Sequence, residues 1–182
     1  MRLLSALLIL PASVAAILWL AATQFGGSSV TSPQPDNGND GQQIYMTRCV
    51  SCHQAEGRGI SGYFPPLDGT QWVLEEEGRL IRIVLHGLTG PTTVQGVAYN
   101  GAMPAWGTVL SDSEIADVLS YIRNAWSNEA PEVKQADVAA VRALTVDRAT
   151  PWTHAELELA ENWSIPSTAS ESDDEDSSED VN

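Results

Sequence analysis

Apolar residues recur with a helical period in the middle of the chain. The clearest stretch has apolar side chains at i, i+3, i+4 and i+7, which share one helical face: Ile115, Val118, Leu119 and Ile122. Residues 111–114 read Ser-Asp-Ser-Glu, a capping box that marks the start of this helix. The pattern therefore predicts a helix whose apolar face lies in a core.

Two earlier stretches predict further helices of the same core. A helix over residues 41–49 would place Ile44 and Tyr45 on its inner face. Residues 80–87 form an apolar run, broken by one arginine, that ends in His-Gly, which is typical of a helix C-terminus. No stretch reads as a strand, so we predict a small all-α domain over residues 41–127.

The N-terminal apolar run, residues 3–22, is long enough to cross a membrane. Its twenty residues contain two serines as the only polar side chains, and as a helix they would reach about 30 Å, the thickness of a bilayer core. We expect residues 1–25 to be an uncleaved anchor with its N-terminus in the cytoplasm, because Arg2 precedes the run. A cleaved signal peptide is the alternative, and Pro11 weakens the anchor hypothesis.

The composition changes on both sides of the predicted domain. Residues 26–40 are rich in Gly, Ser, Pro, Asn and Asp, which is typical of a flexible linker. Residues 128–163 contain two short amphipathic stretches. We predict helices that fold back over the domain or dock onto a partner, since isolated short helices are unstable. Residues 164–182 are mostly Ser, Asp and Glu and predict a disordered tail.

The formal net charge of the 182-residue chain is -15. Seven of its carboxylates lie between positions 171 and 180, a range without a basic residue. A chain this acidic argues against nucleic acid as a partner. The acidic tail is open to two interpretations, steering of a basic partner or a contribution to solubility alone.

The chain's only two cysteines lie in the motif Cys49-Val50-Ser51-Cys52-His53. This spacing is the attachment signature of a c-type haem, in which each thiol adds to one vinyl group of the porphyrin. His53 would then supply a neutral imidazole as the proximal axial ligand. A redox dithiol, a vicinal disulfide and half a zinc site are the alternatives. The dithiol would need a surrounding βαβ pattern, and the zinc site would need more ligands than the chain offers.

Met103 is the candidate for the second axial ligand. We expect it in a loop bounded by Gly and Pro, not on a helical core stripe. A thioether opposite histidine raises the reduction potential and closes the sixth position on the iron. Met46 is too close to the haem motif to reach the opposite face. His86 is a weaker alternative, since a helix C-terminus already accounts for a histidine at that position.

These residues together resemble a bacterial class I monohaem cytochrome c. Three segments carry the resemblance: the haem motif within residues 42–53, Tyr-Phe-Pro-Pro-Leu at 63–67, and Tyr-Asn-Gly-x-Met-Pro-x-Trp at 99–106. The resemblance covers residues 41–127 and implies the class I cytochrome c fold, a small helical bundle around one covalently bound haem c.

The resemblance also implies roles for single residues. Cys49 and Cys52 would carry the haem, with His53 and Met103 as axial ligands. Gly41 and Tyr45 would pack against the last helix of the domain, near Leu119 and Ile122.

In this family a proline-region carbonyl after the haem motif accepts the imidazole N–H. Pro65 or Pro66 is placed for that role, and Pro66 is predicted to contact the cofactor. Such a bond would fix the ring orientation of the proximal histidine.

Other side chains are weaker candidates for contact with the haem. Four could donate hydrogen bonds to its propionates: Trp72, Arg58, Arg82 and Tyr99. Of these we predict Tyr99 in the cofactor site, because arginine is more often a solvated charge. Trp106 is predicted to lie on the haem edge, and core packing without haem contact is the alternative.

The resemblance implies electron transfer and no catalysis by this chain. Similar cytochromes, some with an N-terminal anchor, accept electrons from periplasmic dehydrogenases or donate them to terminal oxidases. We expect a carrier tethered to the inner membrane with its haem domain on the periplasmic side, where this family's haem attachment takes place. A haem c subunit of a dehydrogenase or oxidase complex is the alternative. A haem-based sensor or peroxidase is disfavoured, because Met103 would close the sixth position.

Overall fold

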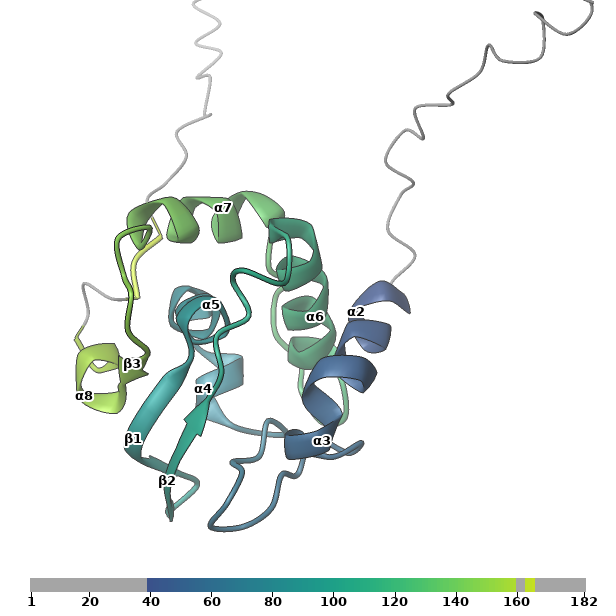
Figure 1. Ribbon diagram of the computed structural model, residues 1–182. Coiled ribbons are helices and arrows are strands. Elements are labelled where there is room, and N and C mark those ends of the chain that lie inside the picture. The colour runs from purple at the N-terminus through teal and green to yellow at the C-terminus, as the bar shows by residue number, and fades with distance from the viewer. Residues whose placement is uncertain (1–38, 160–162, 166–182) are drawn as a thin grey trace, which may run out of the picture. The chain divides into compact units, whose positions relative to one another are not determined.

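The computed structural model describes residues 39–159 and 163–165 (Figure 1). The predicted anchor over residues 1–25 lies outside the described residues, as do most of the predicted linker and tail. In the described ranges, no helix has the length and apolar character needed to cross a membrane.

Helices are the main regular elements of the described chain. In order they are α2 (Asn39–Ile44), a π-helical turn (Tyr45–Cys49), α3 (Val50–His53), α4 (Gln71–Leu74), α5 (Glu77–His86), α6 (Asp112–Asn124), α7 (Gln135–Leu144) and α8 (His154–Leu157). The helices predicted from the apolar pattern are therefore present. The predicted capping box is also formed, because the Ser111 hydroxyl accepts from the Glu114 amide and the Glu114 carboxylate accepts from the Ser111 amide.

The first helix packs closely on the last helix of the domain. Figure 1 shows α2 beside α6, and Gly41 makes this approach possible: a Cβ there would lie 2.2 Å from the carbonyl oxygen of Asp117. Tyr45 is fully buried, with its ring centroid 5.6 Å from that of Tyr121 and 5.3 Å from that of Trp126. The side chain of Tyr45 belongs to the same core cluster as Leu119 and Ile122.

A π-helical turn connects this packing to the cysteine motif. The amide of Val50 donates to the carbonyl of Tyr45, five residues back, so the helix widens just before the motif begins. The Tyr45 hydroxyl donates to the carbonyl of Gln54 at 2.5 Å. Burial raises the pKa of Tyr45, so the phenol remains a donor at neutral pH. Tyr45 thus forms hydrogen bonds at both ends of the cysteine motif, through its carbonyl at Val50 and through its hydroxyl at Gln54.

The expectation that the domain contains no strands is wrong between residues 88 and 103. Strands β1 (Leu88–Val94) and β2 (Val97–Met103) form an antiparallel hairpin, and β3 (Trp152–Thr153) pairs in parallel with β1, which gives the order β2-β1-β3. The two-residue turn has positive φ at Gln95 and Gly96, 49° and 77°. Such a turn matches the twist of a hairpin, and β-branched residues flank it on both sides.

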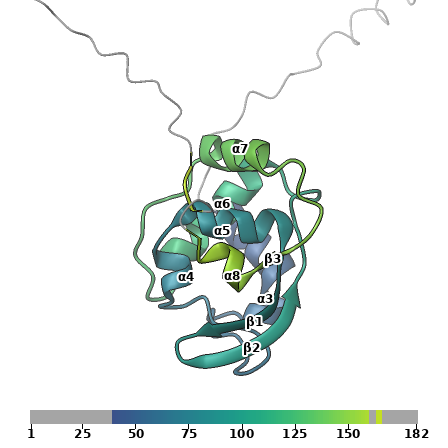
Figure 2. The same ribbon diagram turned by 90° about the vertical axis from the view of Figure 1, so that its left-hand side faces the viewer.

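The segment after the domain lies against it. Helix α7 crosses α5 and α6 and buries Val138 and Val141 in the main core (Figure 1). Figure 2 shows α8 beside β3 and α4, where His154 meets the ring of Trp72 edge to face at a centroid distance of 5.1 Å. The two short helices are therefore stabilised by contacts with the domain.

We expect Gly41→Ala to lower the free energy of unfolding by about 1–3 kcal/mol, the usual cost of overpacking a close contact. Helix propensity alone predicts the opposite, a gain of about 1 kcal/mol for alanine. The measurement is urea unfolding of the haem-loaded protein. The control is Gln42→Ala, at an exposed position of the same helix. A gain in Gly41→Ala would contradict the packing described for α2 and α6.

His86 predicts a pH dependence of stability. Burial lowers its pKa, and the positive charges of three arginines lower it further: Arg148, Arg142 and Arg82. The unfolded imidazole takes up a proton below about pH 6.5, whereas the folded one stays neutral to lower pH, so the free energy of unfolding falls as the pH drops. In His86→Gln, the part of this decrease in the free energy of unfolding that comes from His86 should disappear. Unfolding midpoints of both proteins between about pH 7 and pH 5 check this, and parallel curves would refute it.

Candidate functional site

Two adjoining cavities lie between the cysteine motif, the helices α5 and α6, and the hairpin. They contain about 830 and about 1000 Å³ of space not filled by atoms, part of which opens to solvent. Aliphatic side chains of α5 and α6 form part of the wall of the first cavity. Seven residues line both cavities: Cys49, His53, Pro65, Leu88, Thr92, Met103 and Trp106.

His53 ends helix α3 and is buried, with 9% of its surface exposed. Its Nδ1 lies 3.0 Å from the carbonyl oxygen of Pro65. A carbonyl only accepts, so Nδ1 carries the proton and Nε2 keeps its lone pair. Burial lowers the pKa of His53, against the effect of this hydrogen bond, which raises it. The imidazole is therefore neutral at neutral pH and is oriented as a metal ligand requires.

The geometry decides which of the two prolines accepts the hydrogen bond from His53. The carbonyl that accepts from His53 is that of Pro65, and Pro66 contributes to the wall of the first cavity only. Sequence alone left both open, because adjacent carbonyls point in different directions and only the folded loop decides which one faces the ring.

The two thiols differ from those of a redox dithiol. Cys49 and Cys52 are free and half-buried, and both line the second cavity. Burial and the neighbouring Cys52 raise the pKa of Cys49 to about 11. Reactive CxxC thiols instead have a lowered pKa, so the environment of Cys49 does not suit thiol–disulfide exchange. In the part of the chain that the structure describes, no three His, Cys, Asp or Glu residues gather into a metal cluster, which leaves the zinc alternative without ligands.

Met103 is the last residue of strand β2, so the expected loop position is wrong, and it lines both cavities. The hairpin register pairs it with Leu88, directly after Gly87. Gly87 has φ of +81°, and a Cβ there would lie 2.4 Å from the Met103 carbonyl oxygen, so only glycine allows this approach. Met46 is 47% exposed and lines neither cavity.

The remaining candidates divide into those near the cavities and those away from them. Tyr99 is buried at the second cavity, and the half-buried Trp106 lines both cavities.

Arg58 is exposed and lines neither cavity. Arg82 is also absent from both walls, since its guanidinium donates to the carbonyls of Gly78 and Ser164. His86 lies 2.7 Å from the Thr145 hydroxyl and lines neither cavity, so the structure does not place it as an iron ligand.

The buried indole N–H of Trp72 indicates whether these cavities suit a haem. Trp72 lines the first cavity, and its Nε1 is buried without a hydrogen-bond partner among the described residues. An unpaired buried donor is costly, so it indicates a missing acceptor. A propionate carboxylate is such an acceptor, while the aliphatic walls suit a porphyrin ring. The residues present therefore fit a haem.

Sequence reasoning missed Leu88 and Thr92 as lining residues. Both lie on β1, which the all-α expectation did not contain. A signal was available: residues 92–98 read Thr-Thr-Val-Gln-Gly-Val-Ala, a two-residue Gly-containing turn between β-branched residues.

Comparison with known proteins agrees with this site. The cytochrome c family model matches residues 39–126. Cytochrome c-552 of Thermus thermophilus is 46% identical over 99 residues, which cover 52% of this chain and 73% of that protein. The chain belongs to the cytochrome c family. Its haem c is therefore covalently bound, as predicted, with Cys49 and Cys52 positioned as a CxxCH-type attachment site.

Two cytochrome c subunits of dehydrogenases are also similar to this chain. The cytochrome c subunit of alcohol dehydrogenase (quinone) from Gluconobacter oxydans (strain 621H) is 34% identical over 108 residues, 58% of this chain and 22% of that subunit. The cytochrome c subunit of gluconate 2-dehydrogenase from Pantoea cypripedii is 37% identical over 113 residues, 59% of this chain and 25% of that subunit. The chain thus spans a quarter or less of these two subunits.

Two tryptophans provide a matched test of the missing acceptor. Trp72 and Trp152 are both buried, and each has an Nε1 without a partner among the described residues, but only Trp72 lines a cavity. In the haem-loaded protein, Trp72→Phe should lower the free energy of unfolding by about 1.5–3 kcal/mol more than Trp152→Phe, the value of a hydrogen bond to a charged group. Denaturant unfolding of both variants measures the difference. Equal losses would show that the Trp72 indole has no acceptor.

Proposed function

We propose that this protein is a membrane-tethered electron carrier in which His53 and Met103 bind the haem iron from opposite sides. One observation supports this most directly. The two side chains come from separate elements, α3 and β2, yet both line the same two cavities that fit a haem. A haem with these ligands supplies a one-electron couple, and no substrate bond needs to form or break.

The residues around the ligands favour rapid electron transfer. Burial keeps His53 neutral and the Pro65 carbonyl holds its ring in one orientation, so the geometry of the ring need not change when an electron arrives or leaves. Met103 closes the sixth position and favours the reduced state. Aliphatic side chains of α5 and α6 exclude water from the first cavity, which limits reorganisation of solvent on electron transfer.

The mouth of the second cavity suits contact with a partner protein. Tyr63 and Phe64 line this cavity and are 75% and 37% exposed, and Ile60 nearby in the chain is 43% exposed. Exposed apolar side chains that cluster around a site often mark a protein interface. We propose that redox partners dock at this apolar rim, close to the attachment cysteine Cys52.

The proposed location rests on the sequence. The apolar run of residues 3–22 would hold the carrier in the inner membrane, with the haem domain in the periplasm. The following linker would let the domain move between a donor and an acceptor. Mature protein that begins near residue 24 would refute the anchor.

A second candidate function is a haem c subunit of a dehydrogenase complex. The relatives from Gluconobacter oxydans and Pantoea cypripedii are named as dehydrogenase cytochrome c subunits, which favours this alternative. The native size of the haem-staining species after mild detergent extraction distinguishes the two. A tethered carrier migrates alone from the membrane fraction, and a subunit migrates with a dehydrogenase or oxidase.

Met103→Ala should open the sixth position of the iron. The ferrous wild-type protein should bind no carbon monoxide at neutral pH, whereas Met103→Ala should bind it stoichiometrically, because the closing ligand is gone. Absorption spectra under carbon monoxide measure this. Met46→Ala is the control, since Met46 is exposed and lies away from both cavities. Binding by the wild type, or none by Met103→Ala, would reject Met103 as the ligand.

A further inference from the structure

The segment that follows Met103 is held first by helix α5. The amide of Trp106 donates to the carbonyl of Val84 at 2.9 Å, and the amide of Gly107 donates to that of Leu85 at 3.1 Å. A Cβ at Gly107 would lie 2.6 Å from the Leu85 carbonyl oxygen, so the two backbones are in close contact. The backbone at Gly107, four residues after the proposed ligand Met103, is therefore held in place by α5.

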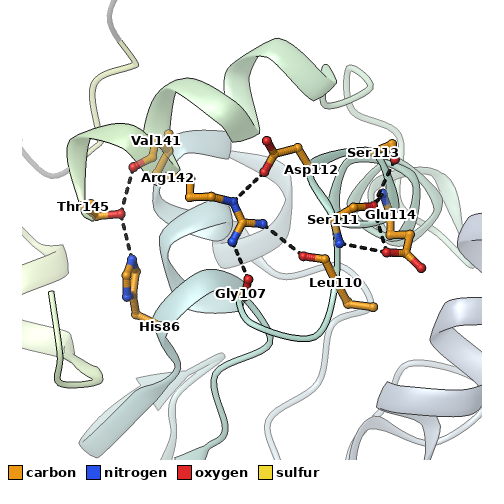
Figure 3. Close-up of polar contacts among 10 residues, drawn as sticks. All are labelled: His86, Gly107, Leu110, Ser111, Asp112, Ser113, Glu114, Val141, Arg142 and Thr145. Carbon is orange, nitrogen blue, oxygen red and sulfur yellow. Dashed lines mark hydrogen bonds and ion pairs between the residues drawn. The ribbon is translucent and has the colours of Figure 1, made fainter. Parts of the chain in front are cut away.

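Arg142 of helix α7 holds the same segment from the other side. Its Nη1 donates to the carbonyl of Gly107, and its Nη2 donates to that of Leu110 at 3.0 Å. Its Nε donates to Asp112 Oδ1 at 2.6 Å, in the first turn of α6. Figure 3 shows the Arg142 side chain reaching from α7 to these three acceptors. One planar guanidinium thus joins α7, the segment after Met103 and α6.

The same C-terminal region also holds the chain next to Met103. The Thr145 hydroxyl donates to the Val141 carbonyl and contacts His86 Nε2 at 2.7 Å, at the end of α5 (Figure 3). The amide of Trp152 donates to the carbonyl of Gly87 at 3.0 Å, beside the β1 residue that pairs with Met103. Residues 135–153 therefore hold the segment after Met103 and also hold His86 and Gly87, just before the β1 residue that pairs with Met103.

We infer that Arg142 is a positioning residue for the axial methionine. By holding the segment at Gly107 and Leu110, it keeps the Met103 sulfur on the iron and limits the fraction of molecules with an open sixth position. The inference rests on the proposed function, in which Met103 is the ligand. Only Pro104, Ala105 and Trp106 separate Met103 from Gly107, and proline restricts the backbone, so movement at Gly107 is transmitted to Met103.

Imidazole binding to the ferric protein measures the open fraction. Its apparent dissociation constant is the intrinsic value divided by the fraction of molecules with an open position. Arg142→Gln removes hydrogen bonds made by a charged group, and we expect about tenfold tighter apparent imidazole binding. Arg142→Lys should bind about as tightly as Arg142→Gln, because lysine keeps the charge but lacks the planar fork.

Arg123→Gln is the matched control. Arg123 is a buried arginine near the end of α6 and donates to the carbonyls of Pro131, Val73 and Glu75. None of these acceptors lies in residues 103–112. Its substitution removes a comparable set of bonds and should leave imidazole affinity close to that of the wild type.

Hydrogen exchange gives a readout that does not depend on the iron. In Arg142→Gln, the amides of Trp106 and Gly107 should exchange faster than in the wild type and in Arg123→Gln, because the segment opens more often. Unchanged exchange at both amides would overturn the inference.

The outcomes separate the inference from the proposed function. Met103→Ala should bind imidazole more tightly than all other variants. If it does not, the ligand assignment fails and the inference fails with it. If Met103→Ala tightens binding but Arg142→Gln does not, only the inference is overturned. It is also overturned if Arg142→Lys keeps wild-type affinity, which would indicate an effect of charge, or if Arg123→Gln tightens binding equally, which would indicate general loss of stability.

Discussion

A haem iron with two protein ligands takes them on opposite faces of one flat ring, and the proposed site depends on this constraint. The two candidate ligands, His53 and Met103, are fifty residues apart in the sequence. The hydrogen bond from His53 Nδ1 to Pro65 fixes the first side chain. The pairing of β1 with β2 places the second at the end of a strand, and Gly87 lets the Met103 backbone approach closely.

The C-terminal region completes this arrangement. The cytochrome c family model ends at residue 126, yet α7 and β3 supply contacts to α5, to β1 and to the segment after Met103. A hairpin with only two strands is marginally stable in water, so its parallel pairing with β3 adds support where the proposed ligand lies. The same residues bury apolar surface of a small domain, which gains stability from each additional packed helix.

Sequence patterns predicted the local features and missed the contacts between distant segments. The haem motif and the capping box at Ser111 depend on neighbouring residues, so they could be read directly. The hairpin was missed because no stretch was read as a strand, although the turn chemistry was present in the sequence. The choice of Pro65 over Pro66 and the contacts of Arg142 could not be read from sequence, because each depends on where a carbonyl points in the folded chain. The unpaired donor of Trp72 is likewise visible only after folding shows that the protein supplies no acceptor among its described residues.

The central claim is that the hairpin presents Met103 to the iron opposite His53. Proton NMR of the ferrous haem-loaded protein tests it most directly, because the porphyrin ring current strongly shifts the methyl signal of an axial methionine upfield. The account predicts that this shifted methyl belongs to Met103, as shown by its loss in Met103→Ala and its retention in Met46→Ala. A shifted methyl that belongs to Met46, or the absence of any shifted methionine methyl, would contradict the account.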